Sequence, residues 1–576
     1  MLKKILSQKA EEIATDRYYQ YPEEGWLNCT LRAATTAAAS ENVNQHKYKE
    51  VFHELIYEQD FIPGGRILRN SGRSRGSLFN CYHLPIGDSI EEIGQLIKDS
   101  LILWSEGGGV GINFSSLRPK GAEILGKGGI SSGLVSFIEA TNAAAKTIES
   151  GGGRRAAAIA TVDVSHPEIM DFIDAKLIHG KLQSFNISVI INEDFILAVE
   201  RDSDWEFKFR EKSCGKIPAR VIWDKIVENM INCAEPGLLN WNNFQKNNSY
   251  YFAPVTGTNP CGETTLEPYG VCNLGSLVLP NFITGSINTN WKKLEYSIRL
   301  AVRFLDNIID SNKYSIKQID INAHRSRRIG IGVLGVADYL FAKKIRYGSE
   351  KSVQELEKLM RFIRDSAYQA SVEIAKEKGA FPAFDPIPYT KASFVRKLPA
   401  DIRMDIKKYG IRNTTLMAMA PTGTISLVAE CSSGVEPLFS KAYLRSDRVS
   451  DRMYVHPVYE KLLLSNEETP DWFVDSFDLQ PKDHFEIQCA IQKYVDGSVS
   501  KTINMPKDST KEDLSKLLLE YIQDLKGVTV YRDGSREGQI LNRVSREEVL
   551  EYLKNNKTEN NLEAIDVRCA SGSCEL

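Results

Sequence analysis

The sequence predicts an α/β protein with parallel strand pairing. Short apolar stretches such as SFNISVII (184–191) have the composition of buried strands, whereas WKKLEYSIRLAVRFLDNIIDSN (291–312) has the periodicity of a long amphipathic helix. Strands and helices alternate along much of the chain, as in proteins whose strands are joined by crossover helices. The 576 residues, 42% of them hydrophobic, are enough for a large core and for about three or four domains.

The elements follow in order from the N-terminus. Residues 1–60 are polar with helical periodicity, and 61–72 form a turn-rich stretch. The stretch 88–109 opens on Asp88 and Ser89, has acids in its first turn and ends in glycines, so both ends of a helix are marked. Another helix is expected over 134–149, between the glycine-rich loops GKGGISSG and ESGGGRRAAAIA. The charged and polar residues from about 542 predict a mobile tail.

Charge and hydropathy exclude several classes of protein. The formal net charge of −3 argues against a general nucleic-acid binder, because such proteins carry a basic surplus. The sequence has no run of about 18 apolar residues and no apolar core of a secretory signal. Its ten cysteines are scattered, which in a large chain without such a signal predicts mostly reduced thiols. We therefore expect a cytoplasmic protein with no nucleic-acid and no membrane partner.

The stretch TGTNPCGETTLEPYGVCNLGS (256–276) holds Cys261 and Cys272, whose spacing suits neither a zinc pair nor a small secreted disulfide scaffold. If the stretch is extended, its period of two points Asn259, Cys261 and Glu263 the same way. An amide, a thiol and a carboxylate would then share one space, where the thiol can lose a hydrogen atom and the carboxylate can take a proton. An ordinary turn with a buried structural cysteine explains this loop equally well.

Two further segments suit phosphate binding. In TLMAMAPTGTIS (415–426) an apolar strand runs into a glycine turn and a helical stretch, so free amides, a helix dipole and hydroxyls would point at one spot. We favour phosphate binding here over a capped strand–helix turn. Arg154 and Arg155 follow three glycines and fit a nucleotide contact or a solvated hinge equally well.

A second pair of cysteines lies near the C-terminal end. Cys569 and Cys574 have only Ala, Ser and Gly between them. Such residues make poor structure but a reachable dithiol, so redox exchange is favoured over inert thiols. No metal site is predicted, since the stretch offers too few ligands.

Several segments, all in the same order, resemble the ribonucleotide reductases, and most closely their class II, adenosylcobalamin-dependent members. They are FIPGGRIL, FNCYHLP, GGGVGINFSSLRPKGAEI, ESGGGRRAAA, TNPCGE with VCNLGS, APTGTIS and VTVYRDGSREGQIL. The resemblance implies a ten-stranded α/β barrel made of two antiparallel five-stranded halves, with TNPCGE as a central finger loop. The predicted regions are an N-terminal helical region (1–70), the barrel (71–541) and a redox-active tail (542–576).

The resemblance also implies a reaction, the reduction of ribonucleotides, here taken as diphosphates, to 2′-deoxyribonucleotides for DNA synthesis. Cys261 would become a thiyl radical and remove the 3′-hydrogen of the substrate. Glu263 would take the proton of the 3′-hydroxyl, and Asn259 would orient the ribose hydroxyls.

The electrons of that reaction would come from a second set of cysteines. Cys81 and Cys272 would deliver two electrons while the 2′-hydroxyl leaves as water. Cys569 and Cys574 would then re-reduce that pair, and would be reduced themselves by thioredoxin or glutaredoxin.

Two nucleotide sites are implied in addition. The substrate-binding residues would be Gly64, Gly65, Asn80, Pro421, Thr422, Gly423, Thr424, Ile425 and Ser426. A specificity effector, a deoxynucleoside triphosphate or ATP, would contact Asp88, Ser89, Ile90, Arg118 and Lys127, and the 150–158 loop would relay its identity to the substrate site. The usual arrangement of the family is a homodimer through the 88–106 helix.

One residue favours class II. Class I large subunits carry two adjacent tyrosines for radical transfer from a partner, whereas VTVYRDGS offers Tyr531 alone. The alternative is a class I-type large subunit that needs a separate, metal-containing radical-generating subunit. A nucleotide-binding regulatory protein without catalysis is disfavoured, because all five expected cysteines and Glu263 are present.

Overall fold

Five parallel strands form the first half of the structure. They are β2 (Cys81–Leu84), β3 (Gly109–Asn113), β6 (Ala158–Asp163), β7 (Phe185–Ile191) and β10 (Gly237–Asn240), each paired in parallel with the next. The intervening helices are α5 (Ile90–Ser105), α6 (Leu134–Lys146), α7 (Ile169–Asp174), α8 (Glu193–Glu200) and α9 (Ala219–Cys233). This order confirms the predicted α/β class. The computed structural model describes residues 6–124, 128–150, 154–177, 180–249, 251–285, 287–446, 451–535 and 541–555.

The second half is built around β14 (Leu274–Val278), which pairs in parallel with β17 (Gly330–Leu334) and antiparallel with β1 (Phe61–Pro63). Parallel bridges from Ile331 to Met417 and from Met419 to Val499 continue toward β20 (Thr502–Met505), which pairs in parallel with β21 (Gly527–Arg532). Antiparallel contacts of β21 with β10, and of β13 (Val271–Cys272) with β2, join the halves.

Among the described strands, the eight-stranded sheet and the three-stranded sheet of β1, β14 and β17 are linked by isolated bridges, and they do not form one closed barrel of continuous strands. The predicted strand 415–420 is buried but makes only single bridges. The reason is that the amides of Leu416 and Met417 donate to the carboxylate of Asp496, both at 2.8 Å, instead of to a neighbouring strand.

Long helices cover the second half. Residues 1–60 form α1 (Gln8–Arg17), α2 (Gly25–Ala38) and α3 (Gln45–Tyr57), as predicted, and α2 and α3 pack on α11 (Trp291–Ser311), which lies beside α14 (Glu350–Lys378). The predicted turn at 61–72 instead contains β1 and α4 (Gly65–Asn70). Phe304 of α11 contacts both Phe52 of α3 and Phe61 of β1 edge to face, so one apolar cluster holds these elements together.

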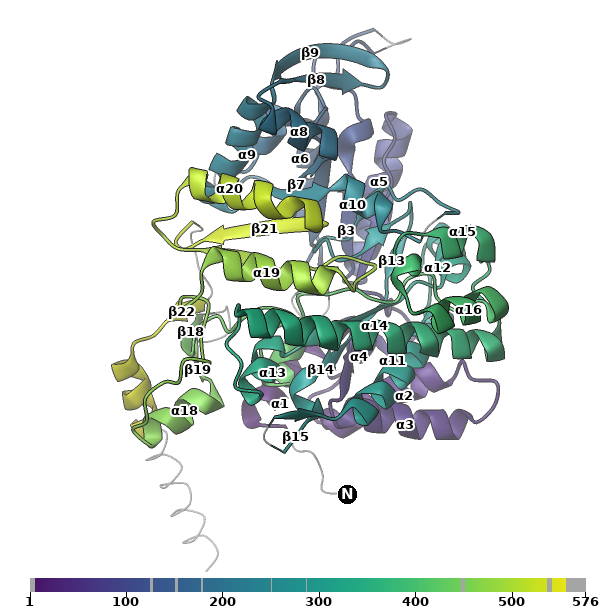
Figure 1. Cartoon of the computed structure of the whole chain (residues 1–576). Coiled ribbons are helices and arrows are strands. Elements are labelled where there is room, and N and C mark those ends of the chain that lie inside the picture. The colour runs from purple at the N-terminus through teal and green to yellow at the C-terminus, as the bar shows by residue number, and fades with distance from the viewer. Residues whose placement is uncertain are drawn as a thin grey trace, which may run out of the picture.

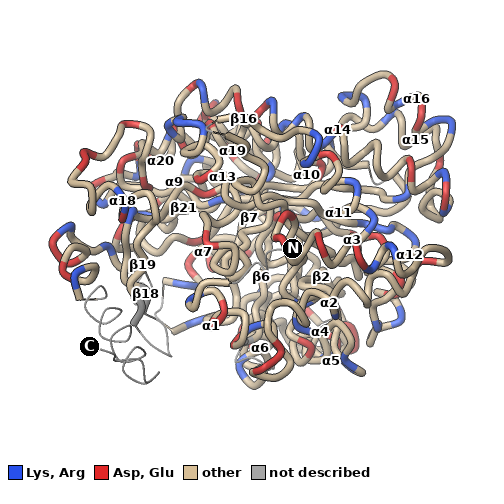
Figure 2. Tube along the Cα trace, turned by 90° about the horizontal axis from the view of Figure 1, so that it is seen from below, with Lys and Arg blue, Asp and Glu red and all other residues tan. Residues whose placement is uncertain are grey.

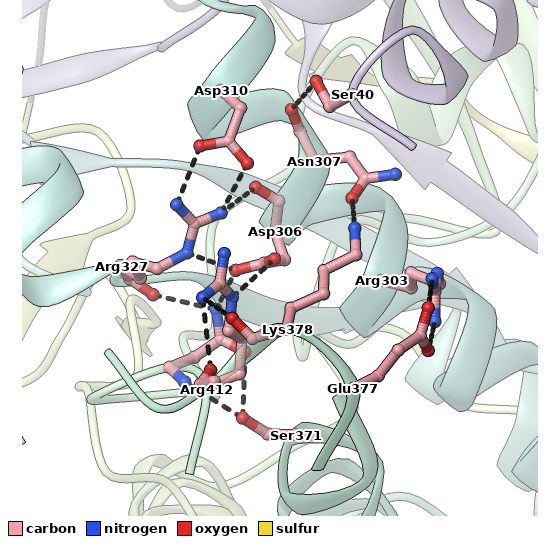
Figure 3. A network of polar contacts seen from close by, with 12 residues as sticks. Ser40, Arg303, Asp306, Asn307, Asp310, Arg327, Ser371, Glu377, Lys378 and Arg412 are labelled. Atoms are coloured by element: carbon pink, nitrogen blue, oxygen red, sulfur yellow. Dashed lines mark hydrogen bonds and ion pairs between the residues drawn. The ribbon is translucent and has the colours of Figure 1, made fainter. Parts of the chain in front are cut away.

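A buried ionic network ties α11 to the segment that leads into the 421–426 turn (Figure 3). Asp306 is fully buried and accepts hydrogen bonds from Arg327 at 2.8 Å, Arg412 at 3.1 Å and Asn413 at 2.9 Å. Arg327 also holds Asp310 with two bonds of 2.8 and 2.9 Å. A charge this deep is tolerated only when it is paired and hydrogen-bonded, so the network specifies how these segments meet.

The C-terminal part differs from the prediction of a mobile tail from residue 542. Strand β22 (Leu541–Arg543) pairs with β18 (Ala442–Ser446), whose other neighbour is β19 (Asp451–Val455). Val549 and Leu553 are buried against Ala442 and Leu463, the latter in α18 (Pro457–Leu464). Apolar side chains at these positions give the segment a small core of its own, at one side of the molecule in Figure 1. Cys569 and Cys574 lie outside the described residues.

Surface charge is mixed. Acidic and basic positions are interspersed along the trace in Figure 2, in keeping with the small net charge. Among the helices that the structure describes, none combines the length and the apolar character needed to cross a membrane.

Candidate active site

The finger loop is a short hairpin with a turn at its tip. Strands β11 (Gly257–Thr258) and β12 (Thr265–Leu266) pair antiparallel. At the tip, the amide of Gly262 donates to the carbonyl of Asn259 at 3.0 Å, and Gly262 has a left-handed φ of 76°. The stretch is therefore not extended at its tip, and the condition under which its three side chains would all point the same way is not met. The turn leaves Cys261 exposed, whereas Asn259 and Glu263 are buried.

Glycines of the GGGVGIN motif make room for this loop. A Cβ on Gly111 would come within 1.7 Å of the Thr258 carbonyl oxygen, and one on Gly109 within 2.9 Å of the Pro260 ring. Both glycines lie on β3, whose backbone the loop therefore approaches directly. A side chain at either position would displace the tip that carries Cys261.

Glu263 has the surroundings of a carboxyl group that changes its protonation state near neutral pH. Burial raises its pKa to about 7, and the nearby Asn259 amide only partly opposes this. Oε2 of Glu263 and Nδ2 of Asn259 are buried and have no hydrogen-bond partner within the described parts of the chain. Since buried polar atoms are normally paired, these two atoms are available to the hydroxyl groups of a ligand.

Two further cysteines meet beside Glu263. Cys272 of β13 lies directly opposite Cys81 of β2 in the antiparallel register. The Cys272 thiol receives a hydrogen bond from the Thr264 hydroxyl at 3.6 Å and donates to Oε1 of Glu263 at 4.0 Å. Burial, followed by the contact with Cys81, raises the pKa of Cys272 well above its ordinary value. The structure thus brings Cys81, Cys272 and Glu263, which the sequence singled out, together with Thr264, the residue after Glu263.

A cavity of about 210 Å³ opens on the other flank of Cys261. Asn259 and Glu263 do not line it. Besides Pro260 and Gly262 of the loop tip, its walls combine hydroxylated, apolar and charged residues from the two halves of the structure: Ile159, Asn186, Ile187, Ser188, Ala234, Glu235, Gly237, Leu238, Leu239, Ser498, Val499, Ser500, Lys501, Thr502, Gly527, Val528 and Thr529. Cys261 therefore has free space beside it that is separate from the buried acid and the cysteine pair.

The predicted substrate-backbone residues also converge. The amide of Gly64 donates to the carbonyl of Leu274 at 2.8 Å, two residues after Cys272. A Cβ on Gly64 would lie 2.6 Å from Nδ2 of Asn80, the residue before Cys81. A Cβ on Gly65 would lie 3.0 Å from the ring of Tyr18. Gly64 and Asn80 thus flank the cysteine pair.

The 421–426 turn differs from its prediction in one respect. The helix that follows, α17 (Ile425–Val428), has only four residues, so the expected helix dipole is small. The amides of residues 423–425 make no hydrogen bond in the described structure. Thr422 has a left-handed φ of 52°, and its hydroxyl accepts a bond from the Gly434 amide at 2.7 Å, which fixes the turn. The free amides, rather than a dipole, could receive an anion.

The predicted effector residues meet in part. Asp88 accepts from the amide of Arg118 at 3.0 Å and pairs with its guanidinium at 3.0 Å, while Ser89 caps α5 and Ile90 is exposed. Lys127 and residues 151–153 lie outside the described residues. Arg210 also pairs with Asp88, at 2.8 Å, from the turn between β8 (Asp204–Phe209) and β9 (Lys212–Pro218). The sequence contained no signal for Arg210, because only the tertiary fold brings this hairpin to α5.

His83 is a second residue that sequence reasoning missed. Its ring bonds to the Gly111 carbonyl and to the Thr256 hydroxyl, both at 2.9 Å, and so joins β2 and β3 to the base of the finger loop. Burial lowers the pKa of His83 to about 4, so the ring is neutral at pH 7. The sequence did offer one signal for His83: it lies in the FNCYHLP motif, two residues after Cys81.

Comparison with known proteins gives consistent matches. A family model described as "Ribonucleotide reductase, barrel domain" matches residues 79–531. The chain is 33% identical to a vitamin B12-dependent ribonucleoside-diphosphate reductase of Thermoplasma acidophilum, over 99% of this chain and 77% of that protein. It is 34% identical to a protein of the same description from Mycobacterium tuberculosis, over 99% of this chain and 84% of that one. A ribonucleoside-diphosphate reductase subunit alpha of Chlamydia trachomatis is 26% identical, over 90% of this chain and 58% of its own length.

Proposed function

This chain belongs to the ribonucleotide reductase family, and we propose on that premise that it is a class II, adenosylcobalamin-dependent ribonucleoside-diphosphate reductase. The observation that carries the proposal is the arrangement of three cysteines. Cys261 lies at a loop tip beside a cavity, while Cys81 and Cys272 face each other across two strands. One-electron chemistry at the first thiol is thereby kept apart from two-electron chemistry at the pair.

The residues on the buried side of the loop handle the ribose. With a pKa near 7, Glu263 can accept the proton of the 3′-hydroxyl at neutral pH. Nδ2 of Asn259 can donate to a ribose hydroxyl. Cys261 removes the 3′-hydrogen as a thiyl radical. Cys81 and Cys272 then supply two electrons and two protons, and the 2′-hydroxyl leaves as water. Glu263 gives its proton back to the 3′-oxygen, and Cys261 returns the hydrogen atom to C3′.

The nucleotide is held at its two ends. The amides of residues 423–425, with the hydroxyls of Thr424 and Ser426, suit the diphosphate. Gly64 and Asn80 lie next to the cysteine pair, Gly65 follows at the start of α4, and all three suit contact with the ribose.

The cavity beside Cys261 fits part of the cofactor. Adenosylcobalamin, when bound, supplies the radical that takes the hydrogen atom of a thiol. Asn186, Ser188, Ser500 and Thr529 line the cavity with amide and hydroxyl groups that would hold the polar edges of its nucleoside part. Gly237 and Gly527 leave space there, and a bulkier wall would exclude the group.

The ten-stranded barrel is part of the proposal. The five parallel strands from β2 to β10 would form one half. Strands β14 and β17, the bridged 416–419 segment, β20 and β21 would form the other, with β10–β21 and β2–β13 as the antiparallel seams.

The proposal also covers allosteric control by an effector and the reductant of the internal cysteine pair. A deoxynucleoside triphosphate or ATP would bind at Asp88, Ser89, Ile90, Arg118 and Lys127, in a homodimer through α5. The dithiol of Cys569 and Cys574 would re-reduce the internal pair and be reduced by thioredoxin or glutaredoxin in the cytoplasm, where such systems act.

The test is turnover of the purified full chain with a ribonucleoside diphosphate, adenosylcobalamin and dithiothreitol alone. Product formation is expected. Turnover only after addition of a metal-containing radical-generating subunit would instead favour the class I-type alternative.

A further inference from the structure

The two sulfurs of the internal pair have unequal access to solvent. Cys81 retains 8% exposure, whereas Cys272 has none. The two cysteines share a small apolar cluster with Leu274 and Ala418. A thiol reagent that comes from solvent therefore meets Cys81 first.

Cys272, the deeper sulfur, is the one that has hydrogen-bonding groups behind it. The Thr264 hydroxyl donates to the Cys272 sulfur at 3.6 Å. The rest of Thr264 is fixed, since its amide donates to Oδ1 of Asn259 at 3.0 Å and its carbonyl accepts from Thr258 at 2.8 Å. The hydroxyl is thus held toward the sulfur by the fold of the finger loop.

We propose that the oxidised Cys81–Cys272 disulfide is opened in one direction, by attack of an external dithiol on Cys81, with Cys272 leaving as a thiolate that the Thr264 hydroxyl stabilises. The proposal rests on the proposed function, because it assumes that turnover oxidises this pair. It adds Thr264 to the residues that act in the reaction.

The step balances as ordinary thiol–disulfide exchange. A thiolate of the external dithiol forms a bond to the Cys81 sulfur, the Cys81–Cys272 bond breaks, and its electron pair goes to Cys272. Glu263 in its protonated form, whose Oε1 lies 4.0 Å from that sulfur, gives the proton to Cys272 and is protonated again from water. The second thiolate of the external dithiol then attacks its own partner sulfur in the mixed disulfide, and Cys81 leaves and takes a proton from water. The pair gains two electrons and two protons, and the external dithiol becomes a disulfide.

The opposite direction is disfavoured by access. Attack on Cys272 requires a reagent to enter a site with no solvent exposure, whereas Cys81 keeps some exposure. Because burial hinders the formation of a thiolate at Cys272, the hydrogen bond from Thr264 is the contact that supports this sulfur when it leaves.

The first experiment locates the attack. The full chain with Cys569→Ser and Cys574→Ser, without cofactor, is oxidised with diamide, and peptide mapping identifies the disulfide. The oxidised chain is then treated briefly with 2-mercaptoethanol, quenched with acid and alkylated. We expect the mercaptoethanol adduct on Cys81 and the alkyl group on Cys272. Adducts on Cys272, or equal amounts on both, would overturn the proposal. If Cys81 and Cys272 form no disulfide at all, the proposed function fails and this inference fails with it.

The second experiment tests Thr264 by the rate of that reduction. Thr264→Val should slow opening by about 10- to 100-fold, the size of one lost hydrogen bond to a charged group, and Thr264→Ser should restore it. Thr265→Val is the matched control, because the Thr265 hydroxyl is buried without a partner in the described residues. Unchanged rates in Thr264→Val, or equal slowing in both valine variants, would contradict the role of the hydroxyl.

Discussion

The backbone amide of Ser498 donates to the carbonyl of Glu263 at 2.7 Å. The candidate base is thereby tied to the segment that precedes β20, and a Cβ on the neighbouring Gly497 would lie only 2.8 Å from the same oxygen. The backbone of Glu263 is thus fixed from two directions, while its carboxylate stays buried next to Cys272. Its ionisation has consequences for activity and for stability.

Glu263→Gln should abolish turnover and change the pH dependence of stability. The folded pKa of about 7 lies above the ordinary 4.5, so stability from this group is present at low pH and is lost as pH rises from about 4.5 to 7. The variant should gain about 3 kcal/mol of unfolding free energy at pH 8 and under about 1 kcal/mol at pH 5. Urea unfolding at both pH values measures this. An equal gain in unfolding free energy at both pH values would contradict the raised pKa.

For the wild-type enzyme, kcat/KM should decrease as the pH falls below about 7, because the protonated carboxyl group of Glu263 cannot accept the proton of the 3′-hydroxyl.

Cys261→Ser should abolish product formation and leave binding of a ribonucleoside diphosphate nearly unchanged. The O–H bond of serine is too strong to yield a usable radical, yet the side chains have similar size. Cys214→Ser, at an exposed cysteine of β9, is the control and should keep full activity. Measurable deoxynucleotide from the Cys261 variant would remove this residue from its assigned role.

Replacing both Cys569 and Cys574 by serine should separate two reductants. The variant should fail with thioredoxin, because that protein cannot reach the buried pair. It should still turn over with dithiothreitol, which is small enough to reach Cys81. Parallel assays with the two reductants decide the matter, and equal loss with both would give the C-terminal cysteines a structural role.

Arg118→Ala should flatten the substrate preference that each effector induces and leave basal turnover largely unchanged. Its guanidinium pairs with Asp88 and can hold a triphosphate bidentately, which lysine cannot imitate. Couplings between such sites typically change affinity about 5- to 150-fold. The assay compares four substrates with each effector, with Lys212→Ala on the nearby hairpin as the control. A full effector pattern in Arg118→Ala would place the specificity site elsewhere.

Asp306→Asn should destabilise the fold by about 3–5 kcal/mol, because Arg412 loses its paired carboxylate and the buried Arg327 loses one of its two. Asp310→Asn removes a partner of the same Arg327, but from a half-buried position, and should cost about 1 kcal/mol or less. Denaturant unfolding of both variants measures the contrast. Equal losses of unfolding free energy in the two variants would mean that the burial of Asp306 does not strengthen its contribution to stability.

Much of the local structure followed from the sequence. Ser89 and the acids after it marked the start of α5. The helical periodicity of apolar residues marked α11, and the apolar run at 185–191 marked β7. Where local rules failed, a longer-range contact had taken over. Asp496 captured the amides of Leu416 and Met417, so a strand that was expected there makes only single bridges. The positive φ of Gly262 reversed the chain at Cys261.

The sequence by itself determined the class of fold, the family and the identity of the candidate reactive residues, because periodicity, end signals and ordered motifs are properties of neighbouring residues. Only the tertiary structure decided which of them touch. The pairing of Cys272 with Cys81, the Thr264 hydroxyl on Cys272 and the approach of Arg210 to Asp88 all join segments far apart or depend on how a loop turns. Such contacts are set by strand register and by close packing across the whole core, which no local pattern encodes.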